Sequence, residues 1–132
     1  MHKIIIFGVI LFAFNLSCIA GNQKSYAEMT AFFDRSKDVV KYQSLYDQLT
    51  KKLNLPEKTV ADQTCAAVEK LKKSKIQESY LNIMEGMAAI SGPPKYAEAL
   101  ALYITLRNKG CSHSESIVDI NDMWTKLIEL KK

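Results

Sequence analysis

Residues 74–94, SKIQESYLNIMEGMAAISGPP, decide the fold class of this chain. Their apolar side chains recur three and four positions apart, which is the period of an amphipathic helix and not of a β-strand. The side chains predicted to share the buried side are Ile76, Tyr80, Ile83, Met84, Met87 and Ile90. Ser74 with Gln77 three residues later predicts a capping box at the start of this helix. Gly92, Pro93 and Pro94 predict its end, because neither glycine nor proline continues a helix well.

The chain upstream of this segment has the same period from residue 25 onward, and no stretch alternates every second residue. We expect two short helices with a break near Ser36, because Ser36 would otherwise interrupt the apolar stripe. Another helix is predicted after Pro56, since proline is tolerated in a first helical turn. Asn54 and Glu57, three residues apart, resemble the two ends of a capping box. The predicted buried side of that helix comprises Val60, Ala61, Thr64, Cys65, Val68 and Leu71.

Two more helices are predicted downstream. Pro94 can begin a helix that reaches Asn108, and Gly110 closes it. Ser112 with Glu115 predicts a capping box for a last helix that continues to the C-terminus. Its apolar stripe comprises Ile117, Ile120, Trp124, Leu127 and Ile128. We therefore expect an all-α fold, a compact bundle of five or six short helices joined by tight turns.

The first 20 residues predict export. Lys3 is the only Lys or Arg among them, an apolar run follows from residue 4 to residue 14, and the small residues Cys18 and Ala20 suit signal peptidase. The run is shorter than the roughly 20 apolar residues that a transmembrane helix needs. We therefore expect residues 1–20 to be a signal peptide and residues 21–132 to form a single helical domain. The mature protein is expected to be periplasmic or secreted, without stable membrane insertion.

The cysteine content predicts a disulfide. Removing the signal peptide removes Cys18 and leaves Cys65 and Cys111, and two thiols in an oxidising compartment are expected to pair. A disulfide closing this loop of about 45 residues would stabilise the fold by roughly 4 kcal/mol. We therefore predict that Cys65 and Cys111 staple the bundle. The alternative role of Cys18, as a lipoprotein anchor, is disfavoured because Asn15 stands where such signals carry leucine.

The sequence offers little for catalysis. His113 is the one histidine of the predicted mature chain, and catalysis needs several polar groups in convergent geometry. A dyad with Ser112 or Ser114 is conceivable, but neighbouring residues do not face one another well, and a capping turn accounts for all three. Cys65, Cys111 and His113 supply too few ligands for a zinc site. We therefore expect no enzyme, no cofactor and no metal, with a small hydrolase using His113 as the alternative.

Charged residues are predicted to lie on the surface. Once Lys3 has left, the chain carries 17 Lys and Arg against 14 Asp and Glu, so its net charge is +3. So small an excess disfavours nucleic-acid binding. The scattered carboxylates lack the spacing of a calcium site. Those interpreted as surface charges are Asp34, Asp38, Asp47, Glu57, Asp62, Glu69, Glu78 and Glu85, and the cluster Lys70, Lys72, Lys73 and Lys75 is interpreted as a solvated face in preference to a binding patch.

Four residues are candidates for contact with another protein. Gly86 costs its helix about 1 kcal/mol relative to alanine, which suggests a close approach by another helix of the same domain or by a partner. Met84 and Met87 suit either a core or an adaptable binding surface. Trp124 is the single tryptophan. The six tyrosines are interpreted as half-buried bundle residues in preference to an interface. An apolar-ligand carrier is a further alternative, and its lining would comprise Phe33, Tyr80, Met84 and Met87.

Part of the chain resembles the HdeA-type periplasmic acid-stress chaperones. The matching stretches are Gln63-Thr64-Cys65, Gly110-Cys111, Met123-Trp124-Thr125-Lys126-Leu127 and the terminal Lys131-Lys132. Members of that family are small exported helical proteins with a Thr-Cys near a helix start, a second cysteine further on, a late Trp-x-Lys and a lysine-rich tail. The resemblance covers residues 63–132. Residues 21–62 have no counterpart in the pattern, and the segment after Cys111 is shorter than in the family.

The resemblance implies a protein-binding protein that is folded at neutral pH, with a homodimer as one expected state, and that opens in acid to shield clients with apolar surface. Protonating the 14 carboxylates and His113 would take the side-chain charge from +3 to about +18, and such repulsion loosens compact states. The alternative is a periplasmic immunity or inhibitor protein that neutralises a toxin such as a cell-wall hydrolase. The bundle is similar in kind to such proteins but shares no motif with them.

Overall fold

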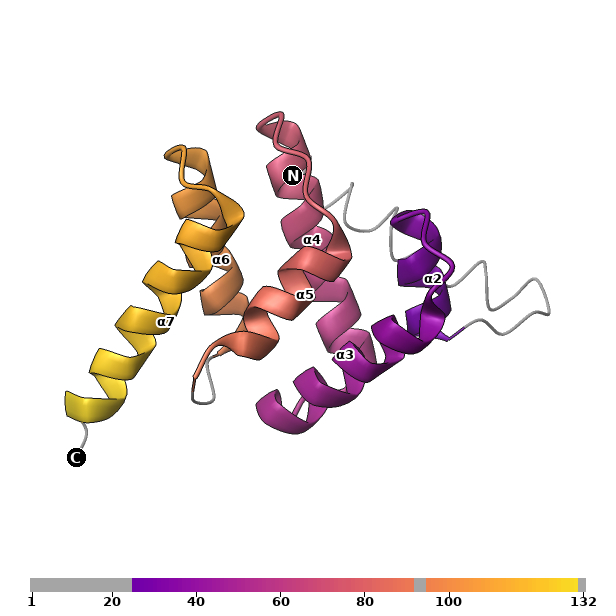
Figure 1. The fold of residues 1–132 in the computed structure, drawn as a ribbon, viewed down its shortest axis with the longest axis horizontal. Coiled ribbons are helices and arrows are strands. Elements are labelled where there is room, and N and C mark those ends of the chain that lie inside the picture. The colour runs from indigo at the N-terminus through magenta and orange to yellow at the C-terminus, as the bar shows by residue number, and fades with distance from the viewer. Residues whose placement is uncertain (1–24, 92–94, 131–132) are drawn as a thin grey trace.

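A computed structural model of the chain describes residues 25–91 and 95–130. Within these ranges the chain forms six α-helices and no β-strand, which confirms the predicted all-α fold (Figure 1). The helices are α2 (Tyr26–Phe33), α3 (Val39–Leu53), α4 (Glu57–Lys73), α5 (Tyr80–Ala89), α6 (Tyr96–Asn108) and α7 (His113–Leu130). The predicted signal peptide, residues 1–20, and the predicted stop at residues 92–94 lie outside the described residues.

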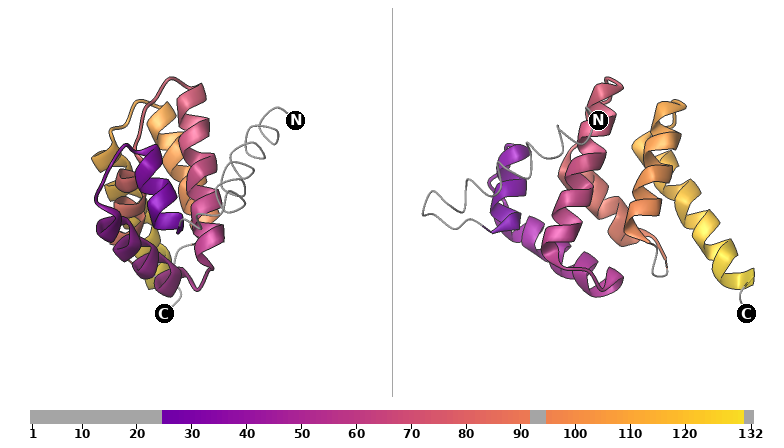
Figure 2. Two further views of the ribbon diagram at one scale, coloured as in Figure 1. Left: turned by 90° about the vertical axis from the view of Figure 1, so that its right-hand side faces the viewer. Right: turned by 180° about the vertical axis from the view of Figure 1, so that it is seen from behind.

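Helix α5 lies at the centre of the bundle (Figures 1 and 2). It contacts α2, α3, α4 and α7, while α4 packs against α6. Helices α2 and α7 lie at opposite ends of the molecule in Figure 1. The predicted buried side of α5 is confirmed, since Tyr80, Ile83, Met84, Met87 and Ile90 are all buried, although Ile76 precedes the helix and is only half-buried. The break predicted near Ser36 is also confirmed, between α2 and α3.

Tyrosines make up much of the core. Tyr42, Tyr46, Tyr96 and Tyr103 are among the largest fully buried side chains. A buried hydroxyl is costly unless it is hydrogen-bonded. The Tyr46 hydroxyl lies 2.5 Å from Thr30 Oγ1, and the Tyr96 hydroxyl lies 2.6 Å from Thr64 Oγ1. The tyrosines of the described core therefore belong to the bundle, as predicted, but these four are fully buried and not half-buried.

Four of the described helices are followed by a residue whose backbone is in the left-handed region, with positive φ. These residues are Arg35 after α2, Asn54 after α3, Lys75 after α4 and Gly110 after α6, with φ of 58°, 55°, 63° and 99°. After α4, the Ile76 N–H donates to the Leu71 carbonyl and the Lys75 N–H donates to the Lys72 carbonyl, both at 2.9 Å. This pair of bonds is the Schellman motif, which reverses the chain and satisfies helix-terminal carbonyls.

These helix ends overturn two predicted N-caps, although the helix predicted after Pro56 does begin there. Ser74 is the C-cap of α4, not the N-cap of the next helix; α5 begins at Tyr80 with Ser79 as its N-cap. Asn54 likewise ends α3, and α4 begins after Pro56 without a side-chain cap. Serine and asparagine occur at both kinds of helix end, so a local spacing cannot decide between them.

Lys75→Gly is expected to raise the free energy of unfolding by about 0.5–1 kcal/mol, because a left-handed backbone costs lysine more than it costs glycine. Urea denaturation followed by circular dichroism measures the change. The matched control is Lys70→Gly, an exposed interior position of α4, which is expected to lower stability by about 1 kcal/mol. A loss of stability in both variants would contradict the prediction.

The predicted disulfide is not formed: Cys65 and Cys111 are both free. Cys65 is buried in a small cluster with Met29 and Tyr80, and its Sγ lies 3.3 Å from the Tyr80 hydroxyl. It therefore faces α2 and α5, whereas Cys111 lies in the turn between α6 and α7. Burial raises the pKa of the Cys65 thiol to about 12, so the thiol stays protonated at neutral pH. The bundle is held together by packing, hydrogen bonds and ion pairs, without a disulfide between Cys65 and Cys111.

Candidate functional site

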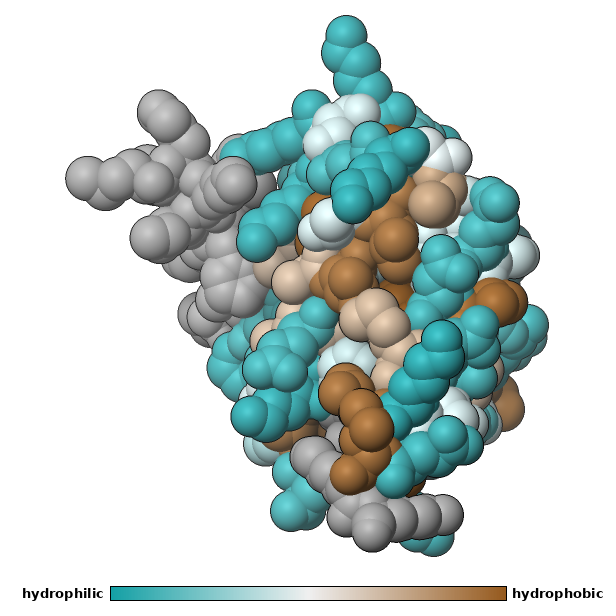
Figure 3. Space-filling model, turned by 90° about the vertical axis from the view of Figure 1, so that its left-hand side faces the viewer, coloured by the Kyte–Doolittle hydropathy of each residue, from teal (hydrophilic) through white to brown (hydrophobic). Residues whose placement is uncertain are grey.

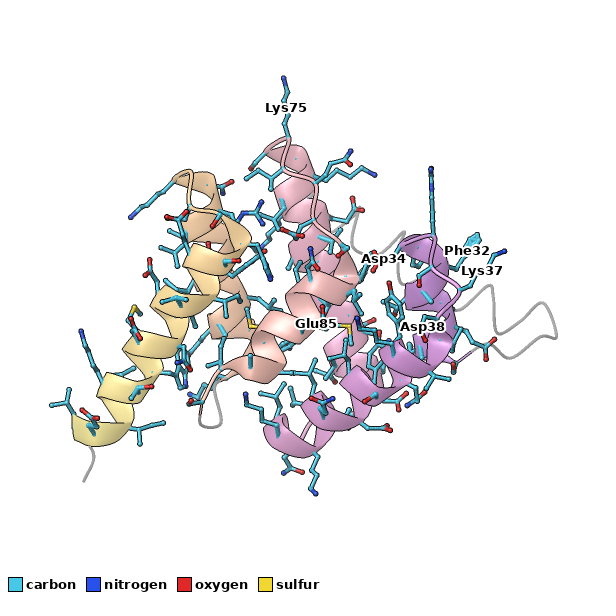
Figure 4. All side chains as sticks on the ribbon, in the orientation of Figure 1. Phe32, Asp34, Lys37, Asp38, Lys75 and Glu85 are labelled. Atoms are coloured by element: carbon cyan, nitrogen blue, oxygen red, sulfur yellow. The ribbon has the colours of Figure 1, made fainter. Side chains whose placement is uncertain are left out.

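Side chains cap the N-terminus of α5. Two of its amides donate to a carboxylate that follows another helix. Asp34, which follows α2, accepts hydrogen bonds from the Tyr80 N–H at 3.0 Å and the Leu81 N–H at 2.9 Å. The Tyr42 hydroxyl donates to the same carboxylate at 2.7 Å. Figure 4 shows Asp34 between the end of α2 and the start of α5. A helix N-terminus carries unpaired N–H groups and a partial positive charge, so a carboxylate there is well placed.

Burial, and then the neighbouring Asp34, raise the pKa of Tyr42 well above its ordinary value, so its phenol stays a hydrogen-bond donor at neutral pH. The amides before and after these two donate to side chains that are close in sequence. The Asn82 N–H donates to Ser79 Oγ at 3.0 Å, and the Ser79 N–H donates to the Glu78 carboxylate at 3.3 Å. Four successive amides at the start of α5 thus have partners, two of them on Asp34.

The C-terminus of α5 is held by a cation. Lys52, near the end of α3, donates from Nζ to the carbonyls of Met87 at 3.2 Å, Ala88 at 3.1 Å and Ile90. Burial lowers the pKa of Lys52, but the ammonium suits the partial negative charge of a helix C-terminus. The two ends of the central helix are therefore clamped by opposite charges that belong to the α2–α3 pair.

Four polar side chains converge where α6 and α7 meet the segment before α5. Arg107 Nη1 forms an ion pair with Glu78 Oε1, and it also donates to the Tyr103 hydroxyl at 2.8 Å. The Tyr103 hydroxyl lies 3.3 Å from Glu78 Oε1 and 2.7 Å from His113 Nδ1. We call Glu78, Tyr103, Arg107 and His113 the polar cluster. It joins the 76–79 segment, α6 and the first residue of α7.

The ion pair of the polar cluster is shielded from water, since the side chains of Glu78 and Arg107 are only 8% and 14% exposed. Burial alone would raise the pKa of Glu78. Hydrogen bonds from Asn82 and Arg107, together with the charges of Arg107 and His113, outweigh it and leave the pKa below its ordinary value. The pKa of Arg107 is raised by its bonds to Glu78 and Tyr103, against the opposing effect of burial. Both groups are therefore charged at neutral pH.

Tyr103 and His113 also contact each other through their rings, whose centroids are 5.7 Å apart in an edge-to-face arrangement. Burial raises the pKa of Tyr103 to about 12, so its phenol is protonated at neutral pH. The predicted capping box is confirmed: the Ser112 N–H donates to Glu115 Oε1 at 2.9 Å and the Glu115 N–H donates to Ser112 Oγ at 3.1 Å. Ser112 thus caps α7, whereas His113 turns toward α6. The arrangement orients α7; it aligns neither serine with the imidazole.

A groove of about 740 Å³ lies between the end of α2, α4 and the 76–80 segment. Phe33 and Tyr80 line it, and their rings stack with centroids 6.0 Å apart. Met84 and Met87, by contrast, are 0% and 1% exposed and belong to the core. The four residues proposed to line an apolar-ligand cavity are therefore divided between a surface groove and the core. Within the described residues, these four side chains do not line one common cavity.

Three of the four candidate protein-contact residues are buried, and the fourth is half-buried. Met84 and Met87 are buried, and a Cβ added to Gly86 would lie 2.4 Å from Ile117 Cδ1 of α7. The close approach predicted at Gly86 is thus made by a helix of the same chain. Trp124 of α7 is half-buried against the core. Met84, Gly86 and Met87 therefore lie inside the folded bundle, where they cannot touch another protein.

Several residues that hold this site were missed from the sequence. Asp34 and Glu78 were interpreted as surface charges, yet each binds groups from at least one other part of the fold. In the sequence, nothing but their charge distinguished Lys52 and Arg107 as residues of this site. Only the spacing of Tyr103 and Arg107, four residues apart on one helix, places two members of the cluster on one face.

Within residues 25–91 and 95–130, three or more metal-ligating side chains nowhere gather into a group that could hold an ion. Across the same part of the chain, each helix is too short or too polar to cross a membrane. Comparison of the chain with models of protein families, with curated proteins and with solved structures finds no match.

Proposed function

We propose that this is an exported protein without catalytic activity that binds other proteins, as an HdeA-like chaperone that shields clients under acid stress. The observation that carries the proposal is the packing of α7 on the central helix at Gly86, where a Cβ would lie 2.4 Å from Ile117 Cδ1. Gly86 lies in a helix whose buried residues are mostly apolar. Lifting α7 would expose the part of α5 that it covers, and apolar surface exposed in this way can bind other proteins.

Helix α7 is suited to act as the movable cover. Ser116 and Ile120 are the buried residues among its 18, although its sequence carries a full apolar stripe. Its start is tied to the body by the polar cluster, to which α7 contributes His113. Gly110, with φ of 99°, lies in the turn that precedes it. Weak burial and a polar attachment favour detachment of this helix before the rest of the fold opens.

Acid favours that detachment. The pKa of Glu78 lies below its ordinary value, so the charged form stabilises the closed state, and that contribution is lost as the pH falls through the folded-state pKa. The growing positive charge of the whole chain acts in the same direction. We infer that α7 opens before the bundle melts, and that the exposed surface of α5 then holds client proteins in solution.

A reversible lock tests this mechanism. Gly86→Cys with Ile117→Cys, in a Cys111→Ser background, is designed to join α5 to α7 by a disulfide. A purified enzyme that aggregates at pH 3, such as alcohol dehydrogenase, serves as client, and light scattering measures its aggregation. The unlocked protein is expected to suppress scattering at least fivefold, the oxidised lock to lose this effect, and reduction to restore it.

The matched control joins α3 to α5 and leaves α7 free. Lys41 Nζ and Glu85 Oε2 form an exposed ion pair 3.6 Å apart, so Lys41→Cys with Glu85→Cys, joined through a short dithiol linker that reduction cleaves, gives a comparable cross-link elsewhere. This variant is expected to protect the client whether oxidised or reduced. Protection by the oxidised lock at the unlocked level, or no protection by the wild type at pH 3, would overturn the proposal.

A second candidate function is that of a periplasmic immunity or inhibitor protein for a toxin such as a cell-wall hydrolase. It is favoured by the apolar side chains that α7 exposes in the closed state, Met123, Leu127 and Leu130, because an inhibitor must bind at neutral pH. The two functions differ in their stoichiometry and pH. One-to-one inhibition of a single hydrolase at pH 7, without client protection at pH 3, would decide for the inhibitor.

A further inference from the structure

Helix α7 carries a seam that continues beyond the body of the protein. Ser116, Ile120, Met123, Leu127 and Leu130 follow one another at alternating spacings of four and three residues. This repeat places side chains in one line along a helix and is the pattern of helix-to-helix packing in coiled coils. Ser116 and Ile120 are fully buried, whereas Met123, Leu127 and Leu130 are 44%, 48% and 82% exposed. Among the helices that the structure describes, none covers the second half of the seam as the first half is covered.

Figure 3 shows the face of the molecule formed by α6 and α7, where apolar side chains gather in a stripe between hydrophilic borders. The exposed large apolar residues that α7 contributes along the seam are Met123, Leu127 and Leu130, which we call the α7 edge. A contiguous apolar surface rimmed by polar residues marks an interaction site more often than isolated exposed side chains do.

Charge on α7 indicates what kind of partner fits. One flank of the seam carries exposed ionisable side chains, namely Glu115, Asp119, Asp122, Lys126 and Glu129. Within the described chain, none of these carboxylates takes part in an ion pair. Four acids and one base make this flank net negative, although the chain as a whole is net positive. The other flank, with Ile117, Trp124 and Ile128, is half-buried and apolar.

We propose that the α7 edge binds an amphipathic helix of another protein, one whose apolar face is bordered by basic residues. The seam supplies the helix-packing geometry, and the acidic flank attracts Lys and Arg on the partner. A second copy of this chain fits less well. Two α7 helices packed antiparallel about a two-fold axis would bring one acidic flank against the other, and like charges repel.

The exposed part of the seam is short. Residues 123–130 form about two helical turns, or about 12 Å of helix, which is well below the extent of a permanent interface. The interaction is therefore a transient one at neutral pH, in the closed state. The inference rests on the proposed function only in so far as both are protein binding. The acid mechanism uses the surface of α5 that α7 covers, whereas the interaction inferred here uses the outer edge of α7.

Trp124 lets the interaction be measured directly, because it is the chain's single tryptophan and lies beside Met123 on α7. The probe is a synthetic 21-residue helical peptide without tryptophan, with leucines in the apolar heptad positions and lysines along both borders. A second peptide has the same leucines with glutamates in place of the lysines. Titrations at pH 7 follow Trp124 emission, and calorimetry checks them. The lysine peptide is expected to bind saturably, and the glutamate peptide at least tenfold more weakly.

Two kinds of variant locate the site. Leu127→Glu, and separately Leu130→Glu, are expected to weaken binding of the lysine peptide at least tenfold. Val118→Glu is the matched control, because Val118 is 57% exposed on the same helix but lies off the seam; it is expected to leave binding unchanged. Asp119→Lys with Asp122→Lys is expected to reverse the preference between the two peptides. Circular dichroism confirms that each variant is folded.

Several outcomes would each overturn the inference, and the first three concern the peptide titrations. They are absence of saturable binding, equal affinity for the two peptides, and equal loss of affinity in Val118→Glu and Leu127→Glu. A protein that sediments as a dimer at pH 7, and becomes monomeric with Leu127→Glu, would assign the α7 edge to a second copy and also refute the proposal. Client protection at pH 3 is measured in parallel, so failure of the neutral interaction is distinguished from failure of the acid mechanism.

Discussion

Asp34→Ala is expected to lower the free energy of unfolding by about 3 kcal/mol, since three donors lose a charged acceptor at once. The Tyr80 and Leu81 amides and the Tyr42 hydroxyl all donate to this carboxylate. The substitution takes this acceptor away from all three donors and removes a negative charge from the N-terminus of α5. Urea unfolding monitored by circular dichroism measures the effect as a shift of the midpoint at unchanged slope.

Asp38→Ala provides the comparison for this prediction. Asp38 is the ordinary N-cap of α3, and its side chain accepts one bond, from the Lys41 N–H at 3.3 Å. Its loss is expected to cost about 1 kcal/mol. A double-mutant cycle of Asp34→Ala with Tyr42→Phe should give a coupling energy of about 1 kcal/mol, because the two residues share a hydrogen bond. Equal costs for the two aspartates would refute the role assigned to Asp34.

Glu78→Gln is expected to lower the free energy of unfolding by about 3 kcal/mol at pH 7, because Arg107 would keep its charge in a shielded position without a counter-ion. Glutamine retains the shape and an acceptor oxygen, so the loss reports the charge. The start of α7 is expected to loosen as well, since Glu78, Tyr103 and His113 form one cluster. Urea unfolding gives the stability, and Trp124 emission reports the environment of α7.

The effect of Glu78→Gln depends on pH with a definite sign. The folded-state pKa of Glu78 is lowered, so its charged form stabilises the fold at every pH above the ordinary glutamate pKa of about 4.3. That contribution disappears as the pH falls through the folded-state pKa, because protonated Glu78 then resembles glutamine. The stability gap between wild type and variant should therefore be widest near pH 7 and narrow below about pH 4.

The exposed pair of Lys41 and Glu85 serves as the control for Glu78→Gln. Their side chains are 49% and 44% exposed, so solvent screens the interaction. Glu85→Gln is expected to cost less than about 1 kcal/mol at pH 7. A stability gap for Glu78→Gln that stays constant between pH 7 and pH 3 would mean that the Glu78 charge is not what holds the polar cluster together.

The sequence predicted features that depend on neighbours along the chain. The break near Ser36, the capping box of Ser112 and Glu115 and the buried side of α5 are each local consequences of side-chain period or hydrogen-bonding geometry. Gly86 also carried a correct signal, because an unfavourable residue inside a helix suggests a close approach. The prediction failed at Ser74 and Asn54, where the same residue types suit the end of one helix and the start of the next.

Sequence alone therefore determined the helical class, the approximate helices and most of their buried faces, because these follow from a period of 3.6 residues and from turn chemistry. Only the tertiary structure decided which charges are structural. Asp34 reaches the amides of residues 80 and 81, Lys52 reaches the carbonyls at the end of α5, and Glu78 meets Arg107. It also turned Cys65 toward α2 and α5, away from Cys111. Contacts between residues far apart in the chain depend on how whole helices dock, and docking is set by the combined packing of many side chains rather than by the spacing of any two.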